Sequence, residues 1–138
     1  MVTGLNHVTL AVADLDRSLA FYTDLLGFRP LVRWPGGAYL SAGSLWLCLS
    51  LDPTTRQAPL PEYTHLALSI TASEVRPFAD RLVAADVVFW KPNSSEGESL
   101  YILDPDHHKL ELHVGDLASR LASLRDAPYE GLQWLDPA

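Results

Sequence analysis

The chain has 138 residues, 48% of them hydrophobic and 20% charged, a composition typical of one compact domain with a substantial core. Its 17 acidic and 10 basic residues give a net charge of −7, which argues against non-specific binding to nucleic acid. One cysteine, Cys48, excludes an intrachain disulfide, and no stretch approaches the roughly 18 apolar residues of a membrane span, so we expect a cytoplasmic protein with no membrane partner.

The first half of the chain predicts a strand, a helix and three further strands. Alternating apolar residues over 5–12 predict the first strand. Asp14 has the character of a helix N-cap, and apolar residues recur behind it at helical spacing: Leu15, Leu19, Tyr22 and Leu26. Short segments with strand character follow, punctuated by glycine and proline: 28–33, 38–41 and 45–50.

The same order of elements returns in the second half. A strand is predicted over 64–70, a helix capped by Ser73 comes next, and three strand segments follow: 87–90, 99–103 and 109–114. A last helix begins at Asp116 with apolar positions Leu117, Leu121 and Leu124. We therefore predict an α+β fold of two βαβββ units in tandem, forming a cupped mixed sheet. The single domain divides into unit one (4–51), a linker (52–62), unit two (63–114) and a C-terminal helix (116–126).

Polar side chains share one face of the predicted strands, opposite the apolar face that one helix per unit can cover. On the first strand, for example, Thr9 lies opposite Val8 and Leu10. These second faces together would line a cup that holds several residues suited to a binding site: His7, Thr9, Tyr39, Trp46, His65, Tyr101 and Glu111.

Three of these residues form a candidate metal site. His7 and His65 stand at matching positions of the two units, and Glu111 lies on the last strand. Two imidazoles and one carboxylate suit a divalent first-row ion and leave positions open for substrate. The alternative is three ordinary, partly exposed strand residues. His113 is a weaker fourth candidate, and we expect His107 and His108 to be solvated in a turn.

Two cations suggest an anion site. Lys91 opens a polar loop over 91–99, whose hydroxyls and amides suit a phosphate-like group, although its oxygens could equally bind a monovalent cation. Arg120 lies on the apolar stripe of the last helix rather than on its solvent face. It either extends along the core toward an acidic partner or points at an anion.

The repeated units, the paired histidines and the segment Asp104–Glu111 resemble the vicinal oxygen chelate superfamily, which includes glyoxalase I. Within it, nearly the full chain is similar to the fosfomycin resistance glutathione transferases. The similarity is strongest in the following segments: 4–10, 37–40, 43–50, 63–65, 93–101 and 111–121.

This resemblance implies a Mn²⁺-dependent, K⁺-stimulated enzyme that opens the epoxide of fosfomycin with the thiol of glutathione. It implies a homodimer of paired units, in which His7 joins His65 and Glu111 of the other copy at one metal. By the same resemblance, the residues that contact the phosphonate are Lys91, Ser95, Tyr101 and Arg120. Thr9 lies beside the epoxide oxygen, Tyr39 faces the thiol and Trp46 packs on the substrate. The K⁺ loop comprises Asn93, Ser95, Glu96, Gly97 and Ser99.

The chain departs from the family pattern at positions that bear on its thiol. Gly36 and Ser94 stand where family members often place Gln and Arg against glutathione, so another thiol is an alternative co-substrate. The hydrolase branch of the family adds water instead, but its glutamate base is replaced here by Ser44, which cannot act as that base. An alternative of another class is a protein that sequesters a ligand without turnover. Such a protein would be expected to lose metal ligands.

Overall fold

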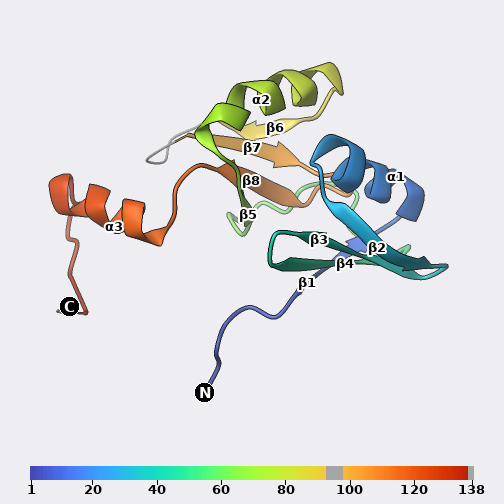
Figure 1. Ribbon diagram of the computed structural model, residues 1–138, viewed down its shortest axis with the longest axis horizontal. Coiled ribbons are helices and arrows are strands. Elements are labelled where there is room, and N and C mark those ends of the chain that lie inside the picture. Colours follow the sequence, from blue (N-terminus) through green and yellow to red (C-terminus); the bar gives the residue numbers. More distant parts are fainter. Residues whose placement is uncertain (93–97, 137–138) are drawn as a thin grey trace.

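The computed structural model of the chain describes residues 1–92 and 98–136. Strand, helix and three strands occur twice in succession, and a C-terminal helix follows (Figure 1). The first unit contains β1 (Val8–Val12), α1 (Leu15–Ala20) with a π-helical turn (Phe21–Leu25), β2 (Arg29–Trp34), β3 (Gly37–Ala42) and β4 (Leu45–Leu51). The second contains β5 (Leu66–Ser69), a 3-10 turn (Ala72–Glu74), α2 (Val75–Ala84), β6 (Phe89–Lys91), β7 (Ser99–Leu103) and β8 (Lys109–His113). Helix α3 (Leu117–Asp126) ends the order.

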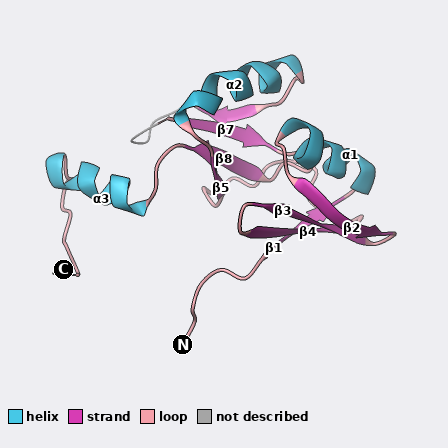
Figure 2. Cartoon of the chain, viewed as in Figure 1, coloured by secondary structure: helices cyan, strands magenta, loops and turns pink. Residues whose placement is uncertain are grey.

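Each unit builds its own four-stranded mixed sheet (Figure 2). The strand orders are β1-β4-β3-β2 and β5-β8-β7-β6, and in each sheet the first strand pairs parallel with the last while the other pairs are antiparallel. The predicted α+β fold of two βαβββ units is confirmed. Among the described residues, β1 and β5 stand at the edges of their sheets.

The helices begin where polar side chains can satisfy free backbone N–H groups, with one exception. Asp14 caps α1 by accepting a hydrogen bond from the backbone N–H of Arg17 at 3.1 Å, and Asp116 and Ser119 form a capping box on α3. Ser73, predicted as the cap of the second helix, does not cap it. It lies inside the 3-10 turn, which leads directly into α2.

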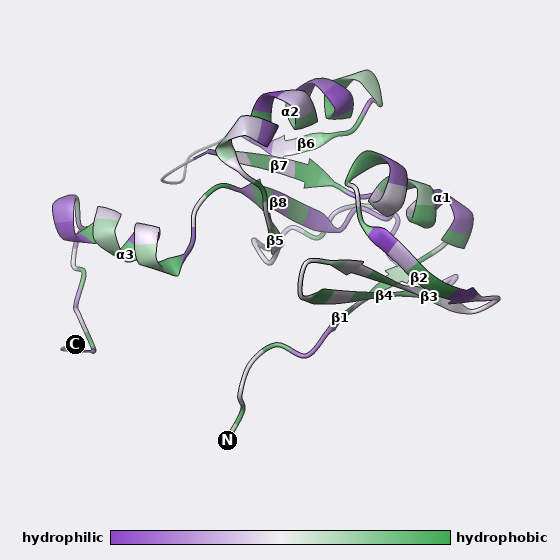
Figure 3. Ribbon diagram, viewed as in Figure 1, coloured by the Kyte–Doolittle hydropathy of each residue, from purple (hydrophilic) through white to green (hydrophobic). Residues whose placement is uncertain are grey.

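One hydrophobic core joins the two units, because α1 and α2 cover the same side of the two sheets (Figure 1). Hydrophobic and hydrophilic residues alternate along the strands, as β8 shows most clearly (Figure 3). Buried leucines of both sheets contribute to this core: Leu40, Leu47, Leu49, Leu110 and Leu112. The opposite faces of the sheets therefore carry the polar side chains predicted for the cup.

A buried polar turn between β7 and β8 bonds unit two to unit one. Asp106, 2% exposed, accepts hydrogen bonds from the backbone N–H of Ala13, the guanidinium of Arg17 and the hydroxyl of Ser18. His108 donates from Nε2 to the carbonyl oxygen of Ala11 at 2.8 Å. The prediction that His108 is solvated is therefore wrong: it is 8% exposed, because the end of β1 covers it. We call residues 104–108 the inter-unit turn.

Asp104 makes the inter-unit turn sensitive to pH. Burial raises the pKa of its carboxyl above 3.8, although it accepts hydrogen bonds from Tyr22 and from two backbone N–H groups of the turn. Its contribution to stability is therefore fully present below 3.8 and is lost as the pH rises through the raised value. Asp104→Asn cannot ionise, so we expect the free energy of unfolding of this variant to increase relative to that of the wild type as the pH rises above 3.8. Urea denaturation at several pH values measures this difference, and a flat or opposite trend would contradict the assignment.

Helix α3 projects away from both sheets (Figure 1). Leu124 is buried as predicted, but Leu117 at the start of the helix is 72% exposed, so the predicted apolar stripe is only partly covered within one chain. Over residues 1–92 and 98–136, every helix is too short or too polar to cross a bilayer.

Candidate metal and substrate site

His65 and Glu111 meet on the polar face of the second sheet. His65 directly precedes β5, which pairs parallel with β8, and the register sets Ala67 beside Glu111. The His65 Nε2 atom lies 3.0 Å from Oε1 of Glu111, a side chain that is nearly buried. The predicted pairing of these two residues is thus present in a single chain.

The hydrogen bonds of His65 show what this contact requires. Its Nδ1 lies 2.8 Å from the main-chain oxygen of Tyr63, which can only accept, so Nδ1 carries the hydrogen. In the neutral ring, Nε2 is then a lone pair facing a carboxylate oxygen, and a proton or a metal cation must lie between them. Two ligands about 2.1 Å from one ion and at right angles to each other are about 3.0 Å apart, so the residues fit a divalent metal.

His7 has the same preparation on the other sheet. Its Nδ1 lies 2.7 Å from Oδ1 of Asn6, so Nδ1 carries the hydrogen and the lone pair of Nε2 is available to a metal ion. A histidine whose Nδ1 hydrogen is held by an oxygen is the usual form of a metal ligand. His7 is exposed and stacks against Trp46 with ring centroids 4.4 Å apart.

The predicted substrate-facing residues of unit one gather around His7. In the sheet register Thr9 pairs with Cys48, and Cys48 pairs with Tyr39, so the three form one row across the polar face. The ring of Tyr39 lies 5.2 Å from that of Trp46. Trp34 extends this aromatic row, 4.9 Å from Tyr39.

Lys91 lies close to the His65–Glu111 pair, inside a group of aromatic rings. Its Nζ donates to the hydroxyl of Tyr63 at 2.7 Å and lies 4.6 Å from the centre of the Tyr101 ring. The hydrogen bond with Tyr63 is the main cause that raises the pKa of Lys91, so the side chain is a full positive charge at neutral pH. Tyr101 in turn pairs with Glu111 across β7 and β8. Lys91 therefore places a positive charge beside His65 and Glu111.

Arg120 lies beside the same sheet. It lines a cavity of about 330 Å³ together with His113, Ser69 and Asp116. Because Ser69 and His113 pair across β5 and β8, this cavity opens next to the face that carries Glu111. Both interpretations of Arg120, an acidic partner and an anion contact, stay predictions.

The second carboxylate oxygen of Glu111, Oε2, contacts two further residues. It accepts a hydrogen bond from the Ser99 hydroxyl at 2.6 Å and lies 3.1 Å from Nδ1 of His113. His113, the weaker fourth candidate ligand, thus contacts the oxygen that His65 does not.

The site residues form two half-sites within one chain. Half-site A lies on the first sheet and comprises His7, Thr9, Tyr39 and Trp46. Half-site B lies on the second sheet and comprises His65, Lys91, Ser99, Tyr101 and Glu111, with Arg120 of α3 beside it. Within the described part of the chain, no three His, Cys, Asp or Glu side chains gather in a metal-binding group, so His7 does not join the other two. The predicted loop residues Asn93, Ser95, Glu96 and Gly97, and Ser94 with them, lie outside the described residues.

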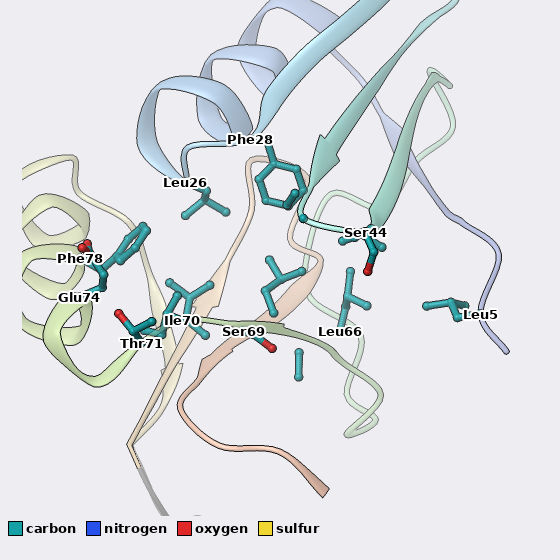
Figure 4. Close-up of a pocket in the computed structure, with 16 residues that line it drawn as sticks. Leu5, Leu26, Phe28, Ser44, Leu66, Ser69, Ile70, Thr71, Glu74 and Phe78 are labelled. Atoms are coloured by element: carbon teal, nitrogen blue, oxygen red, sulfur yellow. The ribbon is translucent and has the colours of Figure 1, made fainter.

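An apolar cavity of about 690 Å³ runs along the open edge of β5 (Figure 4). Leu66 and Ile70 line it from β5 and its end, Phe28 from unit one and Phe78 from α2. Ser44 also lines it, at the turn between β3 and β4. Among the described residues, the predicted metal and phosphonate residues do not line this cavity, and its mostly apolar lining suits an apolar surface better than a charged substrate.

Sequence reasoning missed Tyr63 and Trp90 as site residues. Tyr63 precedes His65 by two positions, so it shares the face of His65, and this spacing was the available signal. Trp90 donates to the carbonyl oxygen of Leu110 and packs 5.2 Å from Tyr101. No periodic pattern in its short strand distinguished Trp90 beforehand.

The family model of the Glyoxalase/Bleomycin resistance protein/Dioxygenase superfamily matches residues 4–112, and the chain belongs to this superfamily. Among curated relatives, the glutathione transferase FosA of Serratia marcescens is 51% identical over 134 residues, covering 96% of this chain and 95% of that protein. The metallothiol transferase FosB of Shouchella clausii is 39% identical over 127 residues, covering 88% and 87%. The resemblance predicted from the sequence is confirmed.

A solved structure of similar fold contains a metal. The fosfomycin resistance protein FosX of Listeria monocytogenes, complexed with Mn(II) and a sulfate ion, matches with a TM-score of 0.79 and 31% identity over 89% of this chain and 98% of that chain.

Proposed function

We propose that this protein is a Mn²⁺-dependent glutathione transferase that opens the epoxide of fosfomycin and so confers resistance to the antibiotic. The contact between His65 Nε2 and Glu111 Oε1 carries the proposal, since it prepares two ligands for one divalent cation. The 51% identity to a glutathione transferase FosA supports the reaction, and the fold shared with a Mn(II)-containing FosX supports the metal. A single free cysteine, Cys48, agrees with a reducing cytoplasm.

His65 and Glu111 would hold Mn²⁺ together with His7 from a second copy of the chain. A divalent ion there supplies Lewis-acid stabilisation for the negative charge that develops on the epoxide oxygen. Thr9, in the row beside His7, would face that oxygen. By resemblance, K⁺ would bind the loop that begins at Asn93 and ends at Ser99.

The cations of half-site B would bind the phosphonate. Lys91 and Arg120 bring two positive charges to the face that carries Glu111, and Tyr101 adds a phenol within reach of Lys91. These charges offset the dianionic substrate, which would otherwise repel an attacking thiolate. Ser95 completes this set by resemblance.

The aromatic row of half-site A would face the thiol. Tyr39 packs between the rings of Trp46 and Trp34. In the sheet register it is separated from Thr9 by Cys48. Gly36 lies directly beneath Trp34, so a side chain at that position would contact the indole.

A homodimer would complete the site. The edges of β1 and β5 are unpaired among the described residues, and the apolar cavity along β5 offers a surface for association. Placing β1 of one copy against β5 of the other would bring half-site A to half-site B and cover both edges.

The reaction is tested with purified protein, Mn²⁺, K⁺ and glutathione. We expect glutathione to be consumed only when fosfomycin is added, and mass spectrometry to show the adduct. Cysteine and bacillithiol in place of glutathione identify the preferred thiol. A fosfomycin diol as the sole product would indicate the hydrolase, which Ser44 argues against. Metal-loaded protein that is inert with every thiol would contradict a transferase and favour a sequestering protein.

Arg120→Ala should weaken saturation by fosfomycin more than it weakens metal binding. A charge-assisted contact with a phosphonate contributes roughly 1.5–3 kcal/mol, so KM for fosfomycin should rise roughly 10- to 100-fold. Steady-state kinetics over a range of fosfomycin concentrations measure this, with Arg125→Ala on the exposed side of α3 as the matched control. An unchanged KM for fosfomycin would contradict a contact between Arg120 and the phosphonate and would indicate a structural role.

A further inference from the structure

The second oxygen of Glu111 lies in a triangle of close polar contacts with Ser99 and His113. Ser99 and His113 face each other across β7 and β8, and Glu111 lies two residues before His113 on the same face. The Ser99 Oγ atom is 2.6 Å from Glu111 Oε2 and 2.6 Å from His113 Nδ1, and His113 Nδ1 is 3.1 Å from Glu111 Oε2. Ser99 and Glu111 are both buried.

The hydrogens of this triangle have one consistent arrangement. Ser99 has one hydroxyl hydrogen and donates it to Glu111 Oε2. The Ser99 oxygen therefore accepts from His113, which places the hydrogen of that ring on Nδ1. The Nδ1 hydrogen of His113 is thus donated to Ser99, and the Ser99 hydroxyl is donated to Glu111 Oε2, which leaves Oε1 to face His65.

His113 and His65 play different parts in this arrangement. The Nδ1 hydrogen of His65 is bound by a main-chain carbonyl, and its Nε2 lone pair faces a carboxylate oxygen, as in a metal ligand. His113 instead donates its Nδ1 hydrogen to Ser99, which in turn donates to the opposite oxygen of the same carboxylate. It therefore holds the carboxylate in position but does not share the point at which Nε2 of His65 and Oε1 of Glu111 converge.

We propose that His113 is a positioning residue that, with Ser99, fixes the rotation of the Glu111 carboxylate so that Oε1 alone is presented to the metal. This role rests on the proposed metal site. A free glutamate carboxylate rotates about its last bond, and ordering it on metal binding costs conformational entropy. The bonds from Ser99 and His113 impose that order before the metal arrives, and outer-shell bonds of this kind typically change metal affinity 10- to 100-fold.

The test is Mn²⁺ binding by the metal-free, full-length protein, with free Mn²⁺ measured from its electron paramagnetic resonance signal. The buffer contains tetramethylammonium in place of K⁺, because this bulky cation cannot be coordinated by oxygen ligands as K⁺ can. We expect His113→Ala to weaken Mn²⁺ affinity roughly 10- to 100-fold. His113→Asn carries an amide N–H at the place of Nδ1 and should recover most of the affinity, whereas His113→Gln, whose amide reaches the place of Nε2, should not.

Two controls separate this role from general damage. His107→Asn removes an imidazole outside the site at a residue with a φ of 65°, a conformation that asparagine tolerates, and should bind Mn²⁺ as wild type does. Thermal unfolding of each metal-free variant shows that it is folded. In addition, Ser99→Ala and His113→Ala combined should lower the affinity by less than the product of their separate effects, because they remove parts of one triangle.

The outcomes distinguish this role from the metal site itself. Equal affinity of His113→Ala and wild type would overturn the role of His113 and leave the metal site intact. An asparagine variant as weak as the alanine variant would also overturn it, since that result indicates a direct ligand through Nε2. Wild-type protein that binds no Mn²⁺ would overturn the metal site, and the positioning role with it.

Discussion

His65→Ala is expected to abolish both Mn²⁺ retention and turnover. The substitution removes the imidazole whose Nε2 faces Glu111 Oε1 at 3.0 Å and leaves that oxygen without its partner. The loss of Mn²⁺ affinity should exceed the roughly 10- to 100-fold effect of an outer-shell change. Metal content after gel filtration and glutathione consumption with fosfomycin are the two measurements.

His107→Asn is the matched control for this prediction, because it also removes one imidazole from the second unit and should retain metal and activity. A His65→Ala protein that keeps full activity would show that the metal ligands are assigned wrongly.

Mixing two inactive variants tests whether the two half-sites come from different chains. His7→Ala leaves half-site B intact, and His65→Ala leaves half-site A intact. A mixed dimer of the two variants has one site with both intact halves, so random mixing should restore about a quarter of the wild-type sites. If each chain built its own complete site, mixing would restore no activity.

Asp106→Ala should cause a large loss of stability. The carboxylate accepts three hydrogen bonds from unit one, and the substitution leaves the buried Ser18 hydroxyl and the Ala13 N–H without it. Unsatisfied buried groups cost about 1–3 kcal/mol each, so we expect a loss of about 2–4 kcal/mol. Chemical denaturation of the metal-free protein measures it.

The chain offers a matched control for this result. Asp16 forms an ion pair with Arg33 at 2.8 Å, but both side chains are mostly exposed. Asp16→Ala should therefore cost less than about 1 kcal/mol. Comparable losses for Asp16→Ala and Asp106→Ala would contradict a special role for the inter-unit turn.

The faces of the strands could be predicted from the sequence because side chains alternate with a period of two. The prediction that Trp46 lies on the polar face of its strand agrees with the burial of its neighbours Leu47 and Leu49 on the opposite face. The placement of His65 and Glu111 on one polar face followed from the same alternation, and the repeat related His65 to His7. The boundaries of the units and the roles of the individual site residues stay predictions.

Features that depend on contacts between distant segments could not be predicted. His108 has the polar sequence context of a solvated turn, and only Ala11, 97 residues away, shows that it is buried. The second helix is preceded by a 3-10 turn that contains Ser73. The preference of serine for helix N-caps does not predict such a turn. Leu117 follows the helical period, yet within one chain nothing covers it among the described residues.

The inter-unit turn has a consequence for the order of assembly. Its buried polar bonds tie the strand that follows His7 to the strand that carries Glu111, so one chain can reach its folded form before it meets another. The proposed dimer would then form by association of two folded subunits, and not by exchange of units during folding. Its rate of formation would depend on the square of the concentration of folded monomer. Whole subunits could therefore be traded between mature dimers without denaturant.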